Sequence, residues 1–148
     1  MFQHLLVPVD GSELSERAID ASIELAVKFG ARITGLVVEP EVSSAMASIA
    51  DPATFARDVQ VQEAESQAHA NKVLGHFEER TRAAGVTFAG EMVAATSIDR
   101  AIVEAARLAG ADLIVMVTHG RGVLGELVFG ANTKSVMSHT KVPLLVLH

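Results

Sequence analysis

The sequence predicts one open, doubly wound α/β domain built on a parallel sheet. Its 148 residues suit a single compact domain spanning 1–148, and a hydrophobic content of 49% supplies a core. Five short apolar runs alternate with four segments whose apolar residues recur at helical spacing. The runs are continuous rather than alternating, as in strands buried on both faces. The predicted strands are 4–9, 32–38, 86–93, 112–117 and 142–147.

The first strand, helix and strand form one crossover unit. The run "HLLVPV" ends in "DGS", where Ser12 can cap a helix whose first turn carries acidic residues. Apolar residues then recur at helical spacing until Gly30, a helix terminator. The next strand follows at 32–38. A short unit of this kind predicts parallel strands and a right-handed connection.

The stretch 39–58 shows no clear period. It contains two prolines and three serines, which predicts a mobile excursion. We expect 41–58 to be the least ordered part of the domain and Arg57 to be the first site of proteolysis.

Three further helices complete the pattern, at 59–84, 97–110 and 131–139. The second of these begins with Ser97 as cap and ends at Gly110. The inner face of the first is expected to carry its apolar residues, namely Val61, Ala64, Ala68, Val73, Leu74 and Phe77.

Composition excludes several functional classes. A net charge of −6 without any basic run argues against non-specific nucleic-acid binding. The absence of cysteine excludes disulfides, thiol nucleophiles and thiolate metal sites. No apolar run approaches the ~20 residues that span a bilayer, and none resembles a signal peptide. The expectation is a cytoplasmic protein with no membrane contact.

Two loops carry unusual chemistry, "PVDGS" after the first strand and "THGRG" after the fourth. If the strand order is 3-2-1-4-5, both face one crevice beyond the carboxyl ends of the strands. Asp10 would present a carboxylate there, while Gly120 and Gly122 would let successive N–H groups point at an anion. From the residues alone, capping of the first helix explains Asp10 and Ser12 at least as well as ligand binding does. His119 after a strand is more often a turn residue than a catalyst.

The chain resembles the universal stress protein family from end to end. The resemblance is carried by "LLVPVDGSELSERAIDASIELA", "LIVMVTHGRG" and "GANTKSVMSHTKVPLLVL". It implies an open five-stranded parallel sheet in the order 3-2-1-4-5, with helices on both faces. It also implies a stress-response regulatory protein, usually a homodimer. One branch of the family binds ATP and another does not.

The sequence keeps part of the binding branch's glycine motif. Gly120 and Gly130 are present with nine residues between them. Val117 stands where the motif has its first glycine, and Ala131 where it has a serine or threonine. The lost hydroxyl contact to phosphate is worth about 1.5–3 kcal/mol, or one to two decades of affinity. The direction of the Val117 side chain decides whether it obstructs the ligand.

The resemblance therefore implies a weakened site for ATP or AMP, with Mg²⁺. Asp10 and Val38 would flank adenine and ribose, and ribose and phosphate would be lined by Met116, Val117, His119 and Gly120. The full predicted set is Pro8, Val9, Asp10, Val38, Met116, Val117, His119, Gly120, Gly122, Gly130, Ala131 and Asn132. The alternative is a homodimeric interaction module of the branch that binds no nucleotide.

No catalytic set is evident in the sequence. There is no P-loop lysine motif and no G-x-S-x-G nucleophile elbow. His69 and His76 lie seven residues apart on one predicted helix, roughly aligned but too distant to share one ion. The sequence predicts no metal site and at most slow ATP hydrolysis, with His119 the best available base.

The last strand is predicted to form a homodimer interface. In the order 3-2-1-4-5 it lies at a sheet edge, and no charged residue guards "VPLLVL". An unguarded apolar edge invites pairing with a second copy about a two-fold axis. The contact residues would be Val142, Leu144, Leu145, Val146 and Leu147. The alternative is a monomer whose edge is protected by Pro143 and His148.

Overall fold

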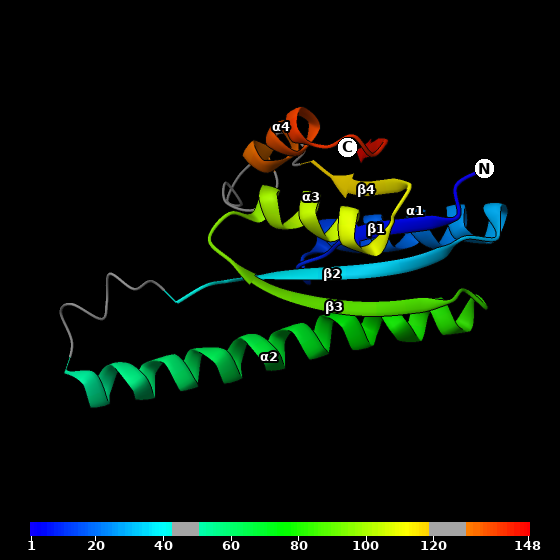
Figure 1. Ribbon diagram of the computed structural model, residues 1–148. Coiled ribbons are helices and arrows are strands. Elements are labelled where there is room, and N and C mark those ends of the chain that lie inside the picture. Colours follow the sequence, from blue (N-terminus) through cyan, green and yellow to red (C-terminus); the bar gives the residue numbers. More distant parts are fainter. Residues whose placement is uncertain (43–50, 119–129) are drawn as a thin grey trace.

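The computed structural model describes residues 1–42, 51–118 and 130–148, with side chains omitted for 130–132. A five-stranded sheet of parallel strands has the order β3-β2-β1-β4-β5, which confirms the predicted fold class (Figure 1). The strands are β1 His4–Pro8, β2 Arg32–Pro40, β3 Phe88–Ala95, β4 Leu113–Val117 and β5 Leu144–Leu147. The helices are α1 Glu13–Phe29, α2 Pro52–Ala83, α3 Ile98–Ala109 and α4 Gly130–His139.

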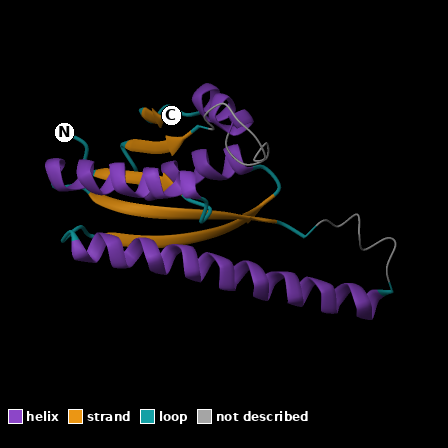
Figure 2. Cartoon of the chain, turned by 180° about the vertical axis from the view of Figure 1, so that it is seen from behind, coloured by secondary structure: helices purple, strands orange, loops and turns teal. Residues whose placement is uncertain are grey.

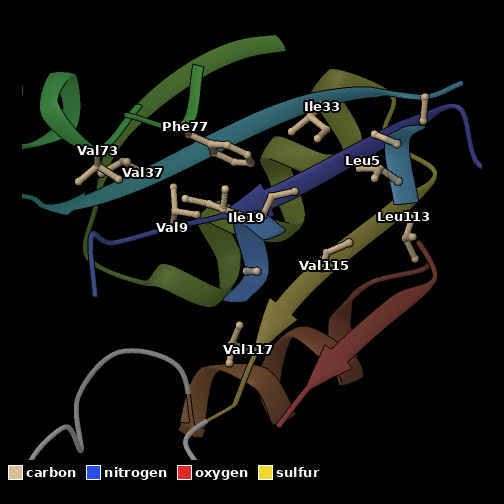
Figure 3. Close-up of a cluster of buried hydrophobic side chains, with 14 of the residues drawn as sticks. Leu5, Val9, Ile19, Ile33, Val37, Val73, Phe77, Leu113, Val115 and Val117 are labelled. Atoms are coloured by element: carbon tan, nitrogen blue, oxygen red, sulfur yellow. The ribbon is translucent and has the colours of Figure 1, made fainter. Parts of the chain in front are cut away.

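Helices cover both faces of the sheet (Figures 1 and 2). The cores show which helix lies on which face. Alternate side chains of β1, such as Leu5 and Val7, pack with α1 and α2, whereas Leu6 between them packs with α3 and α4. Both clusters include fully buried residues, as expected for strands covered on each side. Figure 3 shows the larger cluster, on the α1/α2 face.

The prediction of an irregular stretch over 39–58 is wrong at both ends. Strand β2 continues to Pro40, and α2 begins at Pro52, so Arg57 lies within a helix. Asp51 accepts a hydrogen bond from the Thr54 backbone N–H at 3.3 Å, and proline occupies the first turn. An Asp-Pro pair of this kind is a helix-start signal that the absence of periodicity concealed. Residues 43–50 lie outside the described part.

Helix α2 is half packed and half exposed. Its buried residues all lie in its C-terminal half, and they are Ala70, Val73, Phe77 and Thr81. The N-terminal half extends beyond the sheet (Figures 1 and 2). Val61 is 53% exposed, and Ala64 and Ala68 are exposed too, so the predicted inner face is wrong for these three residues. Val61 and Ala64 precede the first buried residue of the helix, Ala70, by at least six positions, whereas Ala68 lies beside the packed half but on its exposed side.

One glycine at the close helix–sheet contact has a specific packing reason. A Cβ on Gly35 of β2 would lie 2.9 Å from ring atoms of both Phe77 and Phe88. Those two rings have centroids 4.9 Å apart. The missing side chain at Gly35 is what allows this aromatic pair to close over β2.

Candidate functional site

The strand order changes direction between β1 and β4, which is where doubly wound folds place their ligands. β1 pairs with β2 through five residue pairs, from His4–Arg32 to Pro8–Leu36. Within the described residues, β1 and β4 pair only at Leu5–Leu113 and Leu6–Ile114. The two strands therefore part toward their carboxyl ends, and the sheet opens at its switch point.

The loop after β1 is tightly organised at this opening. One carboxylate oxygen of Asp10 accepts a hydrogen bond from the Ser12 N–H at 2.9 Å, and Ser12 Oγ accepts from the Ser15 N–H at 3.2 Å. The capping interpretation is confirmed for Ser12, whereas Asp10 accepts from the N–H of the cap residue itself, and its ligand role stays a prediction. Gly11 has φ +82°, and a Cβ there would lie 2.9 Å from Val73 Cγ2 on α2. Both backbone conformation and close packing thus require glycine.

The hydrophobic residues of the predicted site point into the cores. Val117 is 8% exposed and belongs to the α1/α2 cluster, as does Val9 (Figure 3). Met116 is buried in the α3/α4 cluster. Pro8 is buried and Val38 is half-buried. At Val9, Met116 and Val117 only the backbone can meet a ligand at the carboxyl edge.

The predicted phosphate-binding segment falls partly outside the described residues, where His119, Gly120 and Gly122 lie. Gly130, Ala131 and Asn132 form the first turn of α4, close to the start predicted at 131. Free N–H groups at a helix start attract anions.

Asp99 in the first turn of α3 links this helix to α4. Its carboxylate accepts hydrogen bonds from Ser97 Oγ at 2.5 Å and from Ser135 Oγ of α4. These bonds, that from Ser135 foremost, lower the pKa of Asp99 to about 2. Ser97 stands at the predicted cap position, but its hydroxyl serves Asp99 instead of the helix backbone.

On the other face, His69 of α2 joins two strand ends. Its Nδ1 hydrogen-bonds Glu39 Oε1, and its Nε2 lies 3.2 Å from the Asp10 carbonyl oxygen. Glu39 is the penultimate residue of β2 and is only 8% exposed. The seven-residue spacing of His69 and His76 bears only on a shared metal ion, so it does not predict this link.

A pocket of ≈ 320 Å³ lies between α1 and α2, next to the Asp10 loop. His69 and His76 both line it, so their seven-residue spacing places them on one helix face, as predicted. The other lining residues are Gly11, Ser15, Glu16, Ile19, Lys72 and Val73. The described part of the chain contains no cluster of three or more potential metal ligands.

Comparison with known proteins decides the family. A family model described as the universal stress protein family matches residues 1–148. The chain belongs to the universal stress protein family. A curated relative, universal stress protein YxiE of Bacillus subtilis strain 168, is 28% identical over 150 residues, with 99% of each chain covered.

Solved members of the family share the fold. A universal stress protein from Burkholderia pseudomallei matches with TM-score 0.72 and 26% identity, over 99% of this chain and 96% of the other. A universal stress protein in complex with cAMP matches with TM-score 0.68 and 23% identity, over 99% and 97%. An Arabidopsis thaliana member with AMP bound matches with TM-score 0.65 and 18% identity, over 98% and 90%. At the lower identities the likeness shows the fold alone.

Among the described helices, none is both long and apolar enough to cross a membrane.

Proposed function

We propose that this family member is a stress-response regulatory protein that binds an adenine nucleotide, ATP or AMP, at the β1/β4 switch point. Its affinity is lower than that of relatives with the complete glycine motif, since Ala131 replaces a phosphate-binding hydroxyl. The universal stress protein solved with cAMP and the plant member solved with AMP support the choice of ligand class.

The direction of the Val117 side chain carries the proposal. The most damaging departure from the glycine motif is a β-branched residue where glycine is expected. That side chain packs among Val9 and Val115 in the α1/α2 core instead of projecting beyond the carboxyl edge. The opening beside Asp10 is left to a ligand, and binding would use the main chain of β4.

The phosphates would be held by main-chain N–H groups, which survive both substitutions. Helix α4 begins at Gly130, and its helical start favours negative charge by about 0.3–1 kcal/mol. The described residues offer no metal cluster, so Mg²⁺ would arrive bound to the phosphates of ATP.

Titration calorimetry with ATP and with AMP tests the proposal. Wild-type protein should show saturable binding. Ala131→Ser should bind ATP about tenfold or more tightly, because it restores a hydrogen bond to a charged phosphate. Val117→Gly is a poor companion variant, since it would remove a buried side chain. Folded protein that takes up neither nucleotide would favour the alternative of an interaction module.

We also propose that the protein is a homodimer through β5. This strand lies at the end of the sheet, and its residues Leu144–Leu147 are all half-buried within one chain. An isologous strand pairing would cover the remaining apolar surface.

Leu145 and Leu147 also pack against the core, so Val146→Lys is a cleaner probe of the dimer than Leu145→Lys. Light scattering should report a dimer for wild type and a monomer for Val146→Lys; a wild-type mass of 15.6 kDa would contradict the proposal.

A further inference from the structure

Two histidine–carboxylate pairs involve α2, and they differ in how deeply the carboxylate is buried. His69 bonds Glu39 at the end of β2, while His76 Nε2 lies 3.0 Å from Glu16 Oε2 on α1. The two histidine side chains are equally exposed, at 47%. Their partners are not, since the Glu39 side chain is 11% exposed and that of Glu16 is 39%. Only the first pair secures a buried carboxylate.

His69 has a second partner that His76 lacks among the described residues. Its Nε2 faces the main-chain carbonyl of Asp10 while its Nδ1 faces the Glu39 carboxylate. Both of these partners are oxygen acceptors, and a neutral imidazole has only one N–H to offer. The imidazolium form is the one that donates to both at once.

The two partners of His69 come from the strands predicted to flank the adenine. Asp10 follows β1, and Glu39 follows Val38 on β2. Alternation along β2 sends Glu39 to the α1/α2 face and Val38 to the α3/α4 face, where Val38 joins the core. A single ring on α2 therefore spans the ends of two neighbouring strands.

We propose that His69 is a positioning residue for the nucleotide site, and that its protonated form holds the Asp10 loop against the end of β2. This inference rests on the proposed function. Losing the second proton removes one of the two hydrogen bonds, and a buried carboxylate without its charged partner is strongly disfavoured. The loop then loosens, and nucleotide affinity falls as pH rises.

The charged surroundings of His69 are mixed. Glu39 faces it from β2, and Asp10 carries its own carboxylate in the loop. Glu16 of α1 lines the same pocket, as do Lys72 and His76 of α2. Glu39 is the group in direct contact, so the pH response is assigned to the His69–Glu39 pair.

The test measures AMP affinity from about pH 5.5 to about pH 8.5, the range in which histidines change charge. Wild type should bind more weakly as pH rises. His69→Gln should bind about tenfold more weakly at the acid end and lose the pH dependence. His76→Gln is the matched control, with equal exposure on the same helix, and should follow wild type.

A second readout does not depend on nucleotide. In the free protein, the NMR signals of the Asp10, Gly11 and Val38 amides should titrate together with the His69 ring. In His76→Gln these amides should titrate as in wild type. In His69→Gln they should show no such titration. If these amides titrate but AMP never binds, the proposed function fails and the coupling stands. If they do not follow the His69 ring, or if His69→Gln keeps the wild-type affinity and pH profile, the inference is overturned.

Discussion

The helices on the two faces of the sheet are held by different chemistry. On the α1/α2 face, His69 joins the Glu39 carboxylate and the Asp10 carbonyl, so the link depends on a histidine proton. On the α3/α4 face, Asp99 accepts hydrogen bonds from the hydroxyls of Ser97 and Ser135, groups that do not titrate near neutral pH. The first link is the one that we propose to respond to pH, whereas the hydroxyl donors of the second keep their protons.

The faces also differ in how their helices pack. Phe77 of α2 is fully buried against Phe88, and the packed half of α2 depends on it. On the opposite face Ile102 of α3 is equally buried, and among the described residues its cluster contains no aromatic side chain. The α1/α2 face thus includes an aromatic pair in its core, so the loss of one large side chain there leaves a large cavity.

The largest expected effect is that of Phe77→Ala, at about 3–5 kcal/mol of unfolding free energy, because the change leaves a large cavity. Ile102→Ala should lose about 2–5 kcal/mol. Val61→Ala, on the exposed half of the same helix as Phe77, should stay within about 0.5 kcal/mol. Urea unfolding followed by circular dichroism measures all three. Equal losses for Phe77→Ala and Val61→Ala would refute the division of α2 into a packed and an exposed half.

A smaller effect is expected for Ser135→Ala, about 1 kcal/mol near neutral pH, since Asp99 loses one hydroxyl donor. The folded-state pKa of Asp99, about 2, lies below its ordinary value of 3.8. The stability that Asp99 supplies is therefore present above pH 3.8 and is lost as pH falls toward 2.

Ser135→Ala should raise the pKa of Asp99 and shrink this acid-dependent loss. The matched control is Ser138→Ala on the same helix, because among the described residues Ser138 Oγ bonds only within α4, to Lys134 O at 2.8 Å and Ser135 O at 3.2 Å. Acid titrations of unfolding free energy compare the two variants. Identical acid profiles for them would show that the Asp99–Ser135 link does not hold α4.

The smallest expected effect is a pH slope set by His4 at the amino end of β1. Burial, aided by the charge of Arg32, lowers the pKa of His4 below 6.5. The folded state therefore binds fewer protons than the unfolded chain, and stability falls as pH drops below 6.5. His4→Gln should flatten this slope while keeping a partner for Thr34, whose Oγ1 lies 2.7 Å from His4 Nε2. A wild-type stability that is flat between pH 7 and 5 would contradict the assignment.

Most of the fold could be predicted from the sequence, for local reasons. Continuous apolar runs mark buried parallel strands, and the cap residues Ser12, Gly30 and Gly110 stand where the structure has helix ends. The prediction failed at Pro52, where a helix starts with few apolar residues because half of it has no core to cover. Apolar periodicity reflects the packing of one helix face, so it does not predict a helical segment that packs against nothing.

The site was only partly predictable. The resemblance marks Asp10 and Val117 by position, but the direction of Val117 follows from the phase of β4, which a sequence does not show. The His69–Glu39 link joins residues thirty positions apart, and it exists only because α2 crosses the end of β2. No local sequence pattern predicts such a contact.

The most direct test of the account is to map AMP binding by NMR amide shifts on the wild-type protein. At millimolar AMP, we predict that the largest changes occur at Asp10, Val38 and Thr118, which lie at the carboxyl ends of β1, β2 and β4. The far side of the α1/α2 pocket, at His76 and Ile19, should change little. Changes centred on that pocket, or no changes anywhere while the protein stays folded, would contradict a nucleotide site at the switch point.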